Sequence, residues 1–404
     1  MTRASYSRFI FFYFALLIGT TASACLEPFP DSMDATTLLA LFSVEAVNSD
    51  AHPDVPGVDL IYGGPLVDSV AGSSLFFNSI AVNGSGIYLS YYDEAGERLK
   101  LARSLDSGSH WQHLVVDANG DVGRFNSIEA NGSNIYISYY DATNSDLKLA
   151  TSTDAGLSFR VQVVEGGAGN SGAHSSLAID GVNIYISYND GDTGDLMFIH
   201  SGDSGVSWNA PVIVDATGTM TASSIDMLPG GTVVISYFDD LNNQWRFAKS
   251  VNYGASFPLI RTVDTGGNVP GATSIAAGPT IYISYYDDVN GELRLGRSSA
   301  GGSSWTALPV DTGFDVGDYN ALVLSGTDLY ITYFDETNAD LMLARSGDSG
   351  NNWNRTIIYS TGQVGVATTL RVAGPELSVG YADFQNDLIR FARSTDGGDS
   401  WGMH

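Results

Sequence analysis

Tyrosine and aspartate recur together along the chain, two residues apart, in the pattern Tyr-x-Asp. A tyrosine ring can stack on a sugar or an apolar ligand, and a carboxylate can bind hydroxyl groups or a cation. A structural interpretation competes, because an aspartate that opens a β-turn binds its own backbone and a tyrosine packs well between sheets. Sevenfold repetition favours the structural interpretation, since a single site rarely needs seven identical groups. The pairs are Tyr91/Asp93, Tyr139/Asp141, Tyr188/Asp190, Tyr237/Asp239, Tyr285/Asp287, Tyr333/Asp335 and Tyr381/Asp383.

A second set of candidate residues lacks this regularity. Each copy of the pattern is preceded by a short segment that begins with a small polar residue, and the residue before it varies. If these variable positions surround a central opening, rings on one side and alanines on the other suit a single specific ligand. Uneven packing under loops is the alternative. The variable residues are Phe77, Phe125, His174, Ala222, Ala272, Tyr319 and Ala367.

Metal and cofactor chemistry has weaker support. Acidic residues are frequent in the segments between repeats, so calcium is a candidate ligand. No other cofactor is expected. No stretch has the complete D-x-[DN]-x-[DN]-G loop, and the residues 190–195 only approach it. The metal ligands therefore remain unknown. The acids in question are Asp117, Asp121, Asp215, Asp264, Asp311, Asp315 and Asp318.

An eight-residue phrase, clearest in residues 346–353 (SGDSGNNW), sets the spacing of all these residues. Its serine recurs at positions 104, 152, 201, 250, 298, 346 and 394, so the period is 48 or 49 residues. A fixed period of this length indicates a repeat architecture. The serine and aspartate can bind backbone N–H groups of a tight turn, the glycine permits a positive φ, and the aromatic residue packs into an adjacent layer. The complete copies contain Asp106, Asp154, Asp203, Asp348 and Asp396, whereas Asn252 and Ala300 replace the aspartate elsewhere.

The phrase resembles the Asp box, Ser/Thr-x-Asp-x-Gly-x-x-Trp/Phe, of bacterial neuraminidase repeats and sialidase-like β-propellers. This resemblance covers residues 58–404 and implies that the phrase is a structural turn between the third and fourth strands of a blade, away from the active face. Sialidases grip a carboxylate sugar with three converging arginines, one of them in an Arg-x-Pro phrase. That phrase is absent from the sequence. We therefore assign no catalytic residue from the family.

Each repeat contains four short segments rich in β-branched and aromatic residues. In the second copy these predict strands over 126–130, 135–141, 147–152 and 159–164. Seven such units predict an all-β fold, a seven-bladed β-propeller of four-stranded antiparallel blades. The last copy ends directly after its phrase, whereas residues 64–68 match a fourth strand at 210–215. We predict that residues 60–68 complete the last blade and close the ring.

The N-terminus predicts export. Residues 1–24 carry Arg3 and Arg8, an apolar run from 9 to 18 and a small-residue end, which together form a secretory signal too short for a membrane span. Cys25, the sole cysteine, stands where a bacterial lipoprotein is acylated. Ordinary cleavage that leaves an unmodified cysteine is the alternative. Residues 25–57 contain prolines and acids and predict a tether, followed by the propeller over 58–404.

The charge balance restricts the partners. Without residues 1–24 the chain has 16 basic and 45 acidic residues, a balance that repels nucleic acid and anionic membranes. We expect a monomeric binding module of the cell envelope, or a secreted one, that meets the membrane only through a lipid anchor. Its ligand would be a glycan or a protein bound to the Tyr/Asp-rich face. A sialidase-like glycoside hydrolase and a non-catalytic assembly scaffold are the alternatives.

Overall fold

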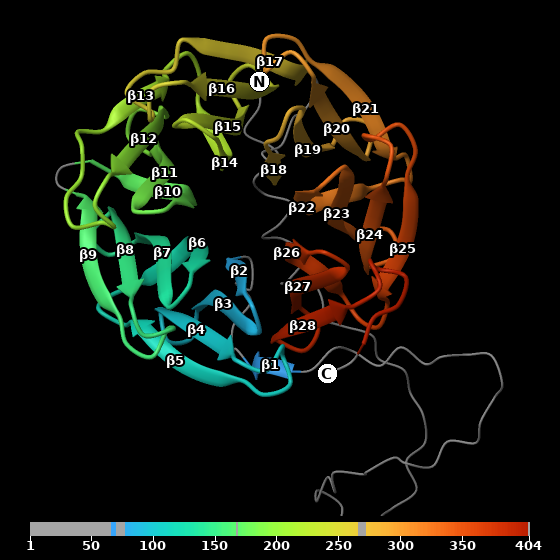
Figure 1. Ribbon diagram of the computed structural model, residues 1–404, viewed down its shortest axis with the longest axis horizontal. Coiled ribbons are helices and arrows are strands. Elements are labelled where there is room, and N and C mark those ends of the chain that lie inside the picture. Colours follow the sequence, from blue (N-terminus) through green and yellow to red (C-terminus); the bar gives the residue numbers. More distant parts are fainter. Residues whose placement is uncertain (1–65, 70–76, 167–168, 266–271, 403–404) are drawn as a thin grey trace, which may run out of the picture. The chain divides into compact units, whose positions relative to one another are not determined.

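The computed structural model describes residues 66–69, 77–166, 169–265 and 272–402. Within these ranges seven four-stranded antiparallel sheets follow one another around a central axis (Figure 1). The predicted seven-bladed β-propeller is therefore confirmed. Over the same ranges there is no helix of the length and hydropathy that a membrane span requires. The predicted signal, Cys25 and the tether lie outside the described residues.

The strands of each sheet run in order from the axis to the rim. Those nearest the axis are β2 (Asn78–Asn83), β6 (Val122–Asn131), β10 (Ser171–Asp180), β14 (Met220–Leu228), β18 (Thr273–Ala276), β22 (Val316–Ser325) and β26 (Val364–Ala373). The second strands are β3 (Gly86–Asp93), β7 (Asn134–Asp141), β11 (Asn183–Asp190), β15 (Thr232–Asp239), β19 (Ile281–Asp287), β23 (Asp328–Asp335) and β27 (Glu376–Asp383).

Third and fourth strands complete the sheets. The third strands are β4 (Arg98–Ser104), β8 (Asp146–Ser152), β12 (Leu196–Ser201), β16 (Gln244–Ser250), β20 (Glu292–Ser298), β24 (Asp340–Ser346) and β28 (Leu388–Ser394). The outer strands are β5 (Gln112–Asp117), β9 (Arg160–Glu165), β13 (Val212–Asp215), β17 (Leu259–Thr265), β21 (Thr306–Asp311), β25 (Asn354–Tyr359) and, in the sheet of β28, β1 (Leu66–Ser69). We number the blades 1 to 7 from the sheet of β2 to the sheet of β26.

The inner strand of blade 2 begins earlier than the sequence predicts. β6 starts at Val122 rather than Asn126, and its pairing with β7 shifts register twice. Gly123 has a φ of 114°, and a Cβ there would lie 2.9 Å from the Cα of Leu99 in blade 1. Such bulges interrupt the alternating pattern from which a strand is recognised, so the sequence pattern does not reveal the first four residues of β6.

Apolar side chains fill the spaces between neighbouring blades. One cluster combines Tyr185 and Phe198 of blade 3 with Ile225, Val233 and Ile235 of blade 4. Because each sheet is covered on both faces, its second strand is apolar on both sides; all eight residues of β3 are buried. Hydrophobic packing between blades is thus the main stabilising contact of the ring.

The repeated phrase forms the turn between the third and fourth strands, as predicted. In its first copy Ser104 Oγ donates to Asp106 Oδ1 over 2.8 Å and accepts the N–H of Gly108 over 2.9 Å. Gly108 has a φ of 94°, and Trp111 packs against Phe391 with ring centroids 5.4 Å apart. Where Ala300 replaces the aspartate, the N–H of Gly302 still donates to Ser298 Oγ over 2.9 Å. The serine and glycine therefore maintain the turn when the carboxylate is absent.

Serine hydroxyls on the inner strands connect one blade to the next. Ser127 Oγ accepts the N–H of Leu177 over 3.1 Å, so a side chain of β6 binds the backbone of β10. The blade 1 and blade 7 inner strands are joined too, since Asn78 Nδ2 donates to the carbonyl of Ala367 over 2.7 Å. The equivalent serine bonds run from Ile128 to Ser79, Ile225 to Ser176, Ile275 to Ser224 and Leu322 to Ser274.

The segment predicted to close the ring is described only in part. β1 pairs antiparallel with β28, and Val67 is buried beside Phe391 in one apolar cluster. Asp68 accepts a hydrogen bond from the Tyr91 hydroxyl of blade 1 over 2.5 Å. Residues 60–65 lie outside the described residues, and the closing role of 60–68 stays a prediction.

Candidate functional site

All seven tyrosines of the Tyr-x-Asp pairs are buried between blades. Their exposed fractions are 1% or less, so they offer no ring face to a ligand, and the surface-stacking interpretation does not fit the structure. The hydroxyl of Tyr139 donates to Asp117 Oδ2 over 2.7 Å, and Asp117 ends the outer strand of the preceding blade. Burial, with the Asp117 carboxylate beside it, raises the pKa of Tyr139. The same bond joins Tyr91 to Asp68, Tyr188 to Glu165, Tyr237 to Asp215, Tyr285 to Asp264 and Tyr333 to Asp311.

The aspartates of the pairs cap turns. Asp141 Oδ1 accepts the N–H groups of Thr143 and Asn144, both over 3.0 Å. Lys148 of the third strand lies between two carboxylates, with its Nζ 2.6 Å from Asp117 and 3.3 Å from Asp141. The corresponding bridges are Arg246 with Asp215 and Asp239, and Arg294 with Asp264 and Asp287. Geometry therefore assigns these acids, with the basic residues of the third strands, to the joints between blades.

The irregular ring of residues lies where the inner strands begin. The Phe125 ring is 4.5 Å from Phe77 and 4.4 Å from His174 between centroids, so three rings form an arc over blades 1 to 3. Burial lowers the pKa of His174 to about 4, which leaves the imidazole neutral near pH 7. The φ angles of Phe125, His174, Ala222, Tyr319 and Ala367 lie between 50° and 52°. Because the alanines share this strain, the backbone bulge causes it rather than the aromatic side chains.

A carboxyl with a high pKa lies next to this ring in blade 6. Asp318 Oδ1 accepts the N–H of Tyr319 over 2.8 Å. Burial first, and then the charges of Glu336 and Asp315, raise the pKa of Asp318 to about 6. Burial and Asp315 also raise the pKa of Glu336. These acids hold protons at a pH at which an exposed aspartate is ionised.

Asp318 is expected to make the ring less stable as the pH rises. A folded-state pKa of about 6, against 3.8 when unfolded, means that the stabilising contribution is complete below pH 4 and is lost as the pH passes 6. In urea titrations at pH 7.5, the free energy of unfolding of Asp318→Asn should therefore be about 2 to 3 kcal/mol higher than that of the parent. At pH 4 the two should differ little. Asp192→Asn, on an exposed turn, is the control. Equal pH profiles for Asp318→Asn and the parent would contradict the assignment.

A polar cavity of about 310 Å³ lies on the axis, between the inner strands. Five of its lining residues are the serines that connect the blades: Ser79, Ser127, Ser176, Ser224 and Ser274. Charged side chains from three blades enter the same cavity, namely Glu129 of β6, Asp226 of β14 and Arg371 of β26. The cavity thus combines hydroxyl, carboxyl and guanidinium groups.

Contacts within the cavity fix the three charged groups differently. Arg371 Nη2 donates to Glu129 Oε1 over 2.8 Å. Asp226 accepts the N–H groups of Ala277 over 2.7 Å and Met227 over 2.6 Å. Burial raises the pKa of Glu129. The positive charge of Arg371 opposes this shift, and the negative charge of Asp226 adds to it. Burial likewise raises the pKa of Asp226.

Sequence reasoning missed these three residues, although a signal was available. They occupy one position of the repeat, two residues after the connecting serine or its equivalent. At that position the other blades have Ala81, Ala178, Ala276 and Val323. Charge at a position that is otherwise apolar marks a departure from sevenfold symmetry, and a comparison of the copies could have found it.

Calcium stays untested. Among the residues that the structure describes, no three His, Cys, Asp or Glu side chains are grouped so as to hold a metal ion. Most of the acids that suggested calcium are instead bonded to tyrosine hydroxyls or paired with lysine and arginine.

Comparisons with known proteins identify the fold. No protein-family model matches the chain, and no curated protein matches it. Among solved structures, a Hadza microbial sialidase has a TM-score of 0.50 and 13% identity, over 76% of this chain and 73% of that one. An α-L-arabinofuranosidase from Fusarium graminearum, in complex with an iminosugar inhibitor, has a TM-score of 0.52 and 11% identity, over 82% and 97%. The resemblance to sialidase-like propellers is confirmed as a resemblance of fold, and the Asp-box assignment stays a prediction.

Proposed function

We propose that the chain is a carbohydrate-binding module that holds a polyhydroxylated ligand on the propeller axis. The observation that carries the proposal is the break of sevenfold symmetry in the axial cavity, where Glu129, Asp226 and Arg371 replace apolar residues. A purely anionic ligand would meet two carboxyls, and a purely cationic one would meet Arg371. Sugar hydroxyls both donate and accept, so they suit this mixture of groups. The arc of Phe77, Phe125 and His174 adds apolar surface where the inner strands begin.

We further propose that the module acts at the cell envelope. The pattern of residues 1–24 supports export, and Cys25 supports a lipid anchor with 25–57 as the tether. The glycan-processing enzymes that share the fold support a glycan ligand over a protein ligand.

A glycan-array screen of the purified protein, followed by calorimetry on the best glycan, tests the axial site. Glu129→Gln and Asp226→Asn should each weaken binding at least tenfold, because each removes an acceptor inside the cavity. Glu376→Gln is the matched control, since it removes an exposed carboxylate paired with Arg393 over 2.8 Å on the same blade as Arg371. Unchanged affinity in both cavity variants would contradict the proposal. No glycan binding at all would favour the scaffold alternative.

Glycoside hydrolysis is the second candidate, and one observation favours it. Glycosidases use two carboxyl groups, and Glu129 and Asp226 line one cavity with raised pKa values. For exo-α-sialidase activity the arginines are too few, because Arg371 is the one arginine that lines the cavity within the described residues. Turnover of fluorogenic glycosides that is lost in both cavity variants would replace binding by hydrolysis as the function.

A further inference from the structure

The joint between blades 3 and 4 lacks a contact that four other joints share. At four joints a basic side chain of the third strand reaches 52 residues ahead, to a backbone carbonyl of the next blade's turn. These bonds are Arg103 to Ala155 (2.7 Å), Lys249 to Gly301 (3.1 Å), Arg297 to Ser349 (2.8 Å) and Arg345 to Gly397 (3.5 Å). In blade 3 the equivalent residue of the third strand is His200. The equivalent turn residue of blade 4, which lies opposite, is Tyr253. A shorter side chain therefore faces a larger one at this joint.

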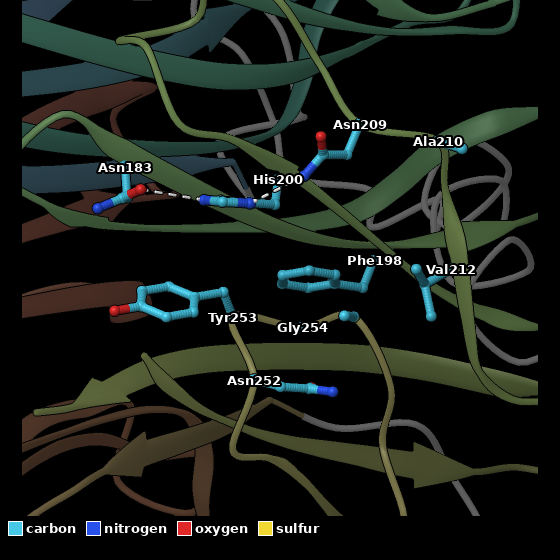
Figure 2. A pocket seen from close by; sticks show the side chains of 10 residues that line it. Asn183, Phe198, His200, Asn209, Ala210, Val212, Asn252, Tyr253 and Gly254 are labelled. Atoms are coloured by element: carbon cyan, nitrogen blue, oxygen red, sulfur yellow. Dashed lines mark hydrogen bonds between the residues drawn. The ribbon is translucent and has the colours of Figure 1, made fainter. Parts of the chain in front are cut away.

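This exchange accompanies a cavity of about 550 Å³ between the two blades. Figure 2 shows the His200 imidazole between Asn183 and Asn209, with the rings of Tyr253 and Phe198 across the cavity. Phe198 is buried, whereas 48% of Tyr253 is exposed. Tyr253 has a φ of 59°, which is a rare conformation for a bulky residue. The turn itself sets this φ, because Ser107 and Ser204 at the equivalent position have φ angles of 61° and 60°. What distinguishes this joint is the exposed aromatic ring.

Hydrogen bonds fix His200 in one neutral form. Asn209 Nδ2 donates to Nδ1 over 3.1 Å, and Nε2 donates to Asn183 Oδ1 over 3.2 Å. The ring stacks on Tyr185 with centroids 4.8 Å apart and planes inclined by 12°. Burial lowers the pKa of His200, so the imidazole stays uncharged near pH 7. All residues that line the cavity are consequently uncharged, in a chain whose net charge is −27.

We propose that this joint is a second binding site, for one uncharged pyranose residue of a glycan. A neutral lining cannot compensate a ligand charge, which disfavours both anions and cations. The half-exposed ring of Tyr253, whose centroid lies 6.3 Å from that of His200, suits the C–H groups of a sugar, and the carboxamides of Asn183 and Asn209 suit its hydroxyls. The site is separate from the axial cavity and does not depend on it, since no residue lines both cavities.

The repeat itself supplies two variants for the test. Tyr253→Ser introduces the residue found at the same turn position in Ser107, Ser204 and Ser349, whose φ angles are 61°, 60° and 62°. His200→Arg introduces the residue of blades 1, 5, 6 and 7, whose long side chain should cross the joint and fill the cavity. Both variants should fold, because the same residues already occupy equivalent positions. Thermal unfolding of each variant checks this.

Saturation-transfer NMR and titration of the full chain with neutral methyl hexopyranosides measure the site. We expect saturable binding of at least one glycoside, weakened tenfold or more in both variants and unchanged in Arg297→His, which alters another joint. Absence of binding to the parent protein, or equal binding to folded variants, would overturn the proposal. Tetramethylammonium binding at this joint in place of the glycosides would overturn the ligand class, because it would identify an aromatic cage for cations. Axial binding that persists in His200→Arg would distinguish the two sites.

Discussion

Deleting residues 60–68 should unfold the propeller or bring it close to unfolding. Without β1 the outer edge of β28 is unpaired, and Phe391 loses its contact with Val67. Asp68 also leaves, so Lys100 and the Tyr91 hydroxyl lose a shared partner at the joint between the two chain ends. Burying Val67 contributes about 2 kcal/mol, and breaking a largely buried ion pair costs about 3 to 5 kcal/mol. Together these losses of about 5 to 7 kcal/mol reach the lower end of the stability of an ordinary domain, about 5 to 15 kcal/mol.

Point variants make this prediction sharper. Val67→Asp introduces a charge at a position that is 2% exposed, so it should lower the unfolding free energy by several kcal/mol. Val206→Asp, at a position that is 70% exposed, makes the same exchange and should have little effect. A nine-residue deletion at 40–48 controls for chain length. Thermal unfolding that is unchanged after deletion of 60–68, or in Val67→Asp, would contradict closure by this segment.

The repeat made most of the fold predictable from the sequence. Its period gave the number of blades, and its Ser-x-Asp-x-Gly phrase gave the turn between third and fourth strands, because both depend on contacts within a few residues. The predicted start of the inner strand in blade 2 was wrong, since Gly123 and Phe125 lie in a bulge where Gly123 packs closely on Leu99 of the neighbouring blade. A local sequence pattern carries no information on a contact between two blades, such as that of Gly123 with Leu99.

The candidate site was harder to predict for a related reason. A sequence shows which residue types recur, but it does not show which carboxylate lies opposite which tyrosine. Asp117 and Tyr139 are 22 residues apart and belong to different blades, so their bond could not be read from the sequence, and the surface interpretation of Tyr139 stayed open beside the favoured structural one. Glu129 and Arg371 are 242 residues apart and meet only because the ring closes. Asymmetric positions of the repeat were the better guide to function.

Asp215→Ala should be among the most damaging single substitutions in the protein. The Asp215 side chain is fully buried and accepts bonds from the Tyr237 hydroxyl over 2.6 Å and from Arg246 over 2.7 Å. Its removal leaves the largely buried Arg246 guanidinium with one carboxylate, that of Asp239 at 3.2 Å, and with the Thr217 hydroxyl at 2.6 Å. We expect a loss of about 3 to 5 kcal/mol in urea unfolding, the usual cost of removing one partner of a buried ion pair. Asp192→Ala, on an exposed turn, should stay within about 0.5 kcal/mol of the parent.

The two interpretations of the Tyr-x-Asp pairs make opposite predictions for the same variants. If the pairs join blades, Tyr237→Phe should cost about 1 kcal/mol, since one hydrogen bond is lost and Asp215 keeps Arg246. The double variant with Asp215→Ala should then cost less than the sum, because both changes remove one shared bond. If the pairs formed a surface ligand site, Tyr237→Phe would leave stability nearly unchanged and weaken glycan binding instead. Tyr237 is fully buried, so we expect the first outcome, with glycan affinity unchanged in folded Tyr237→Phe.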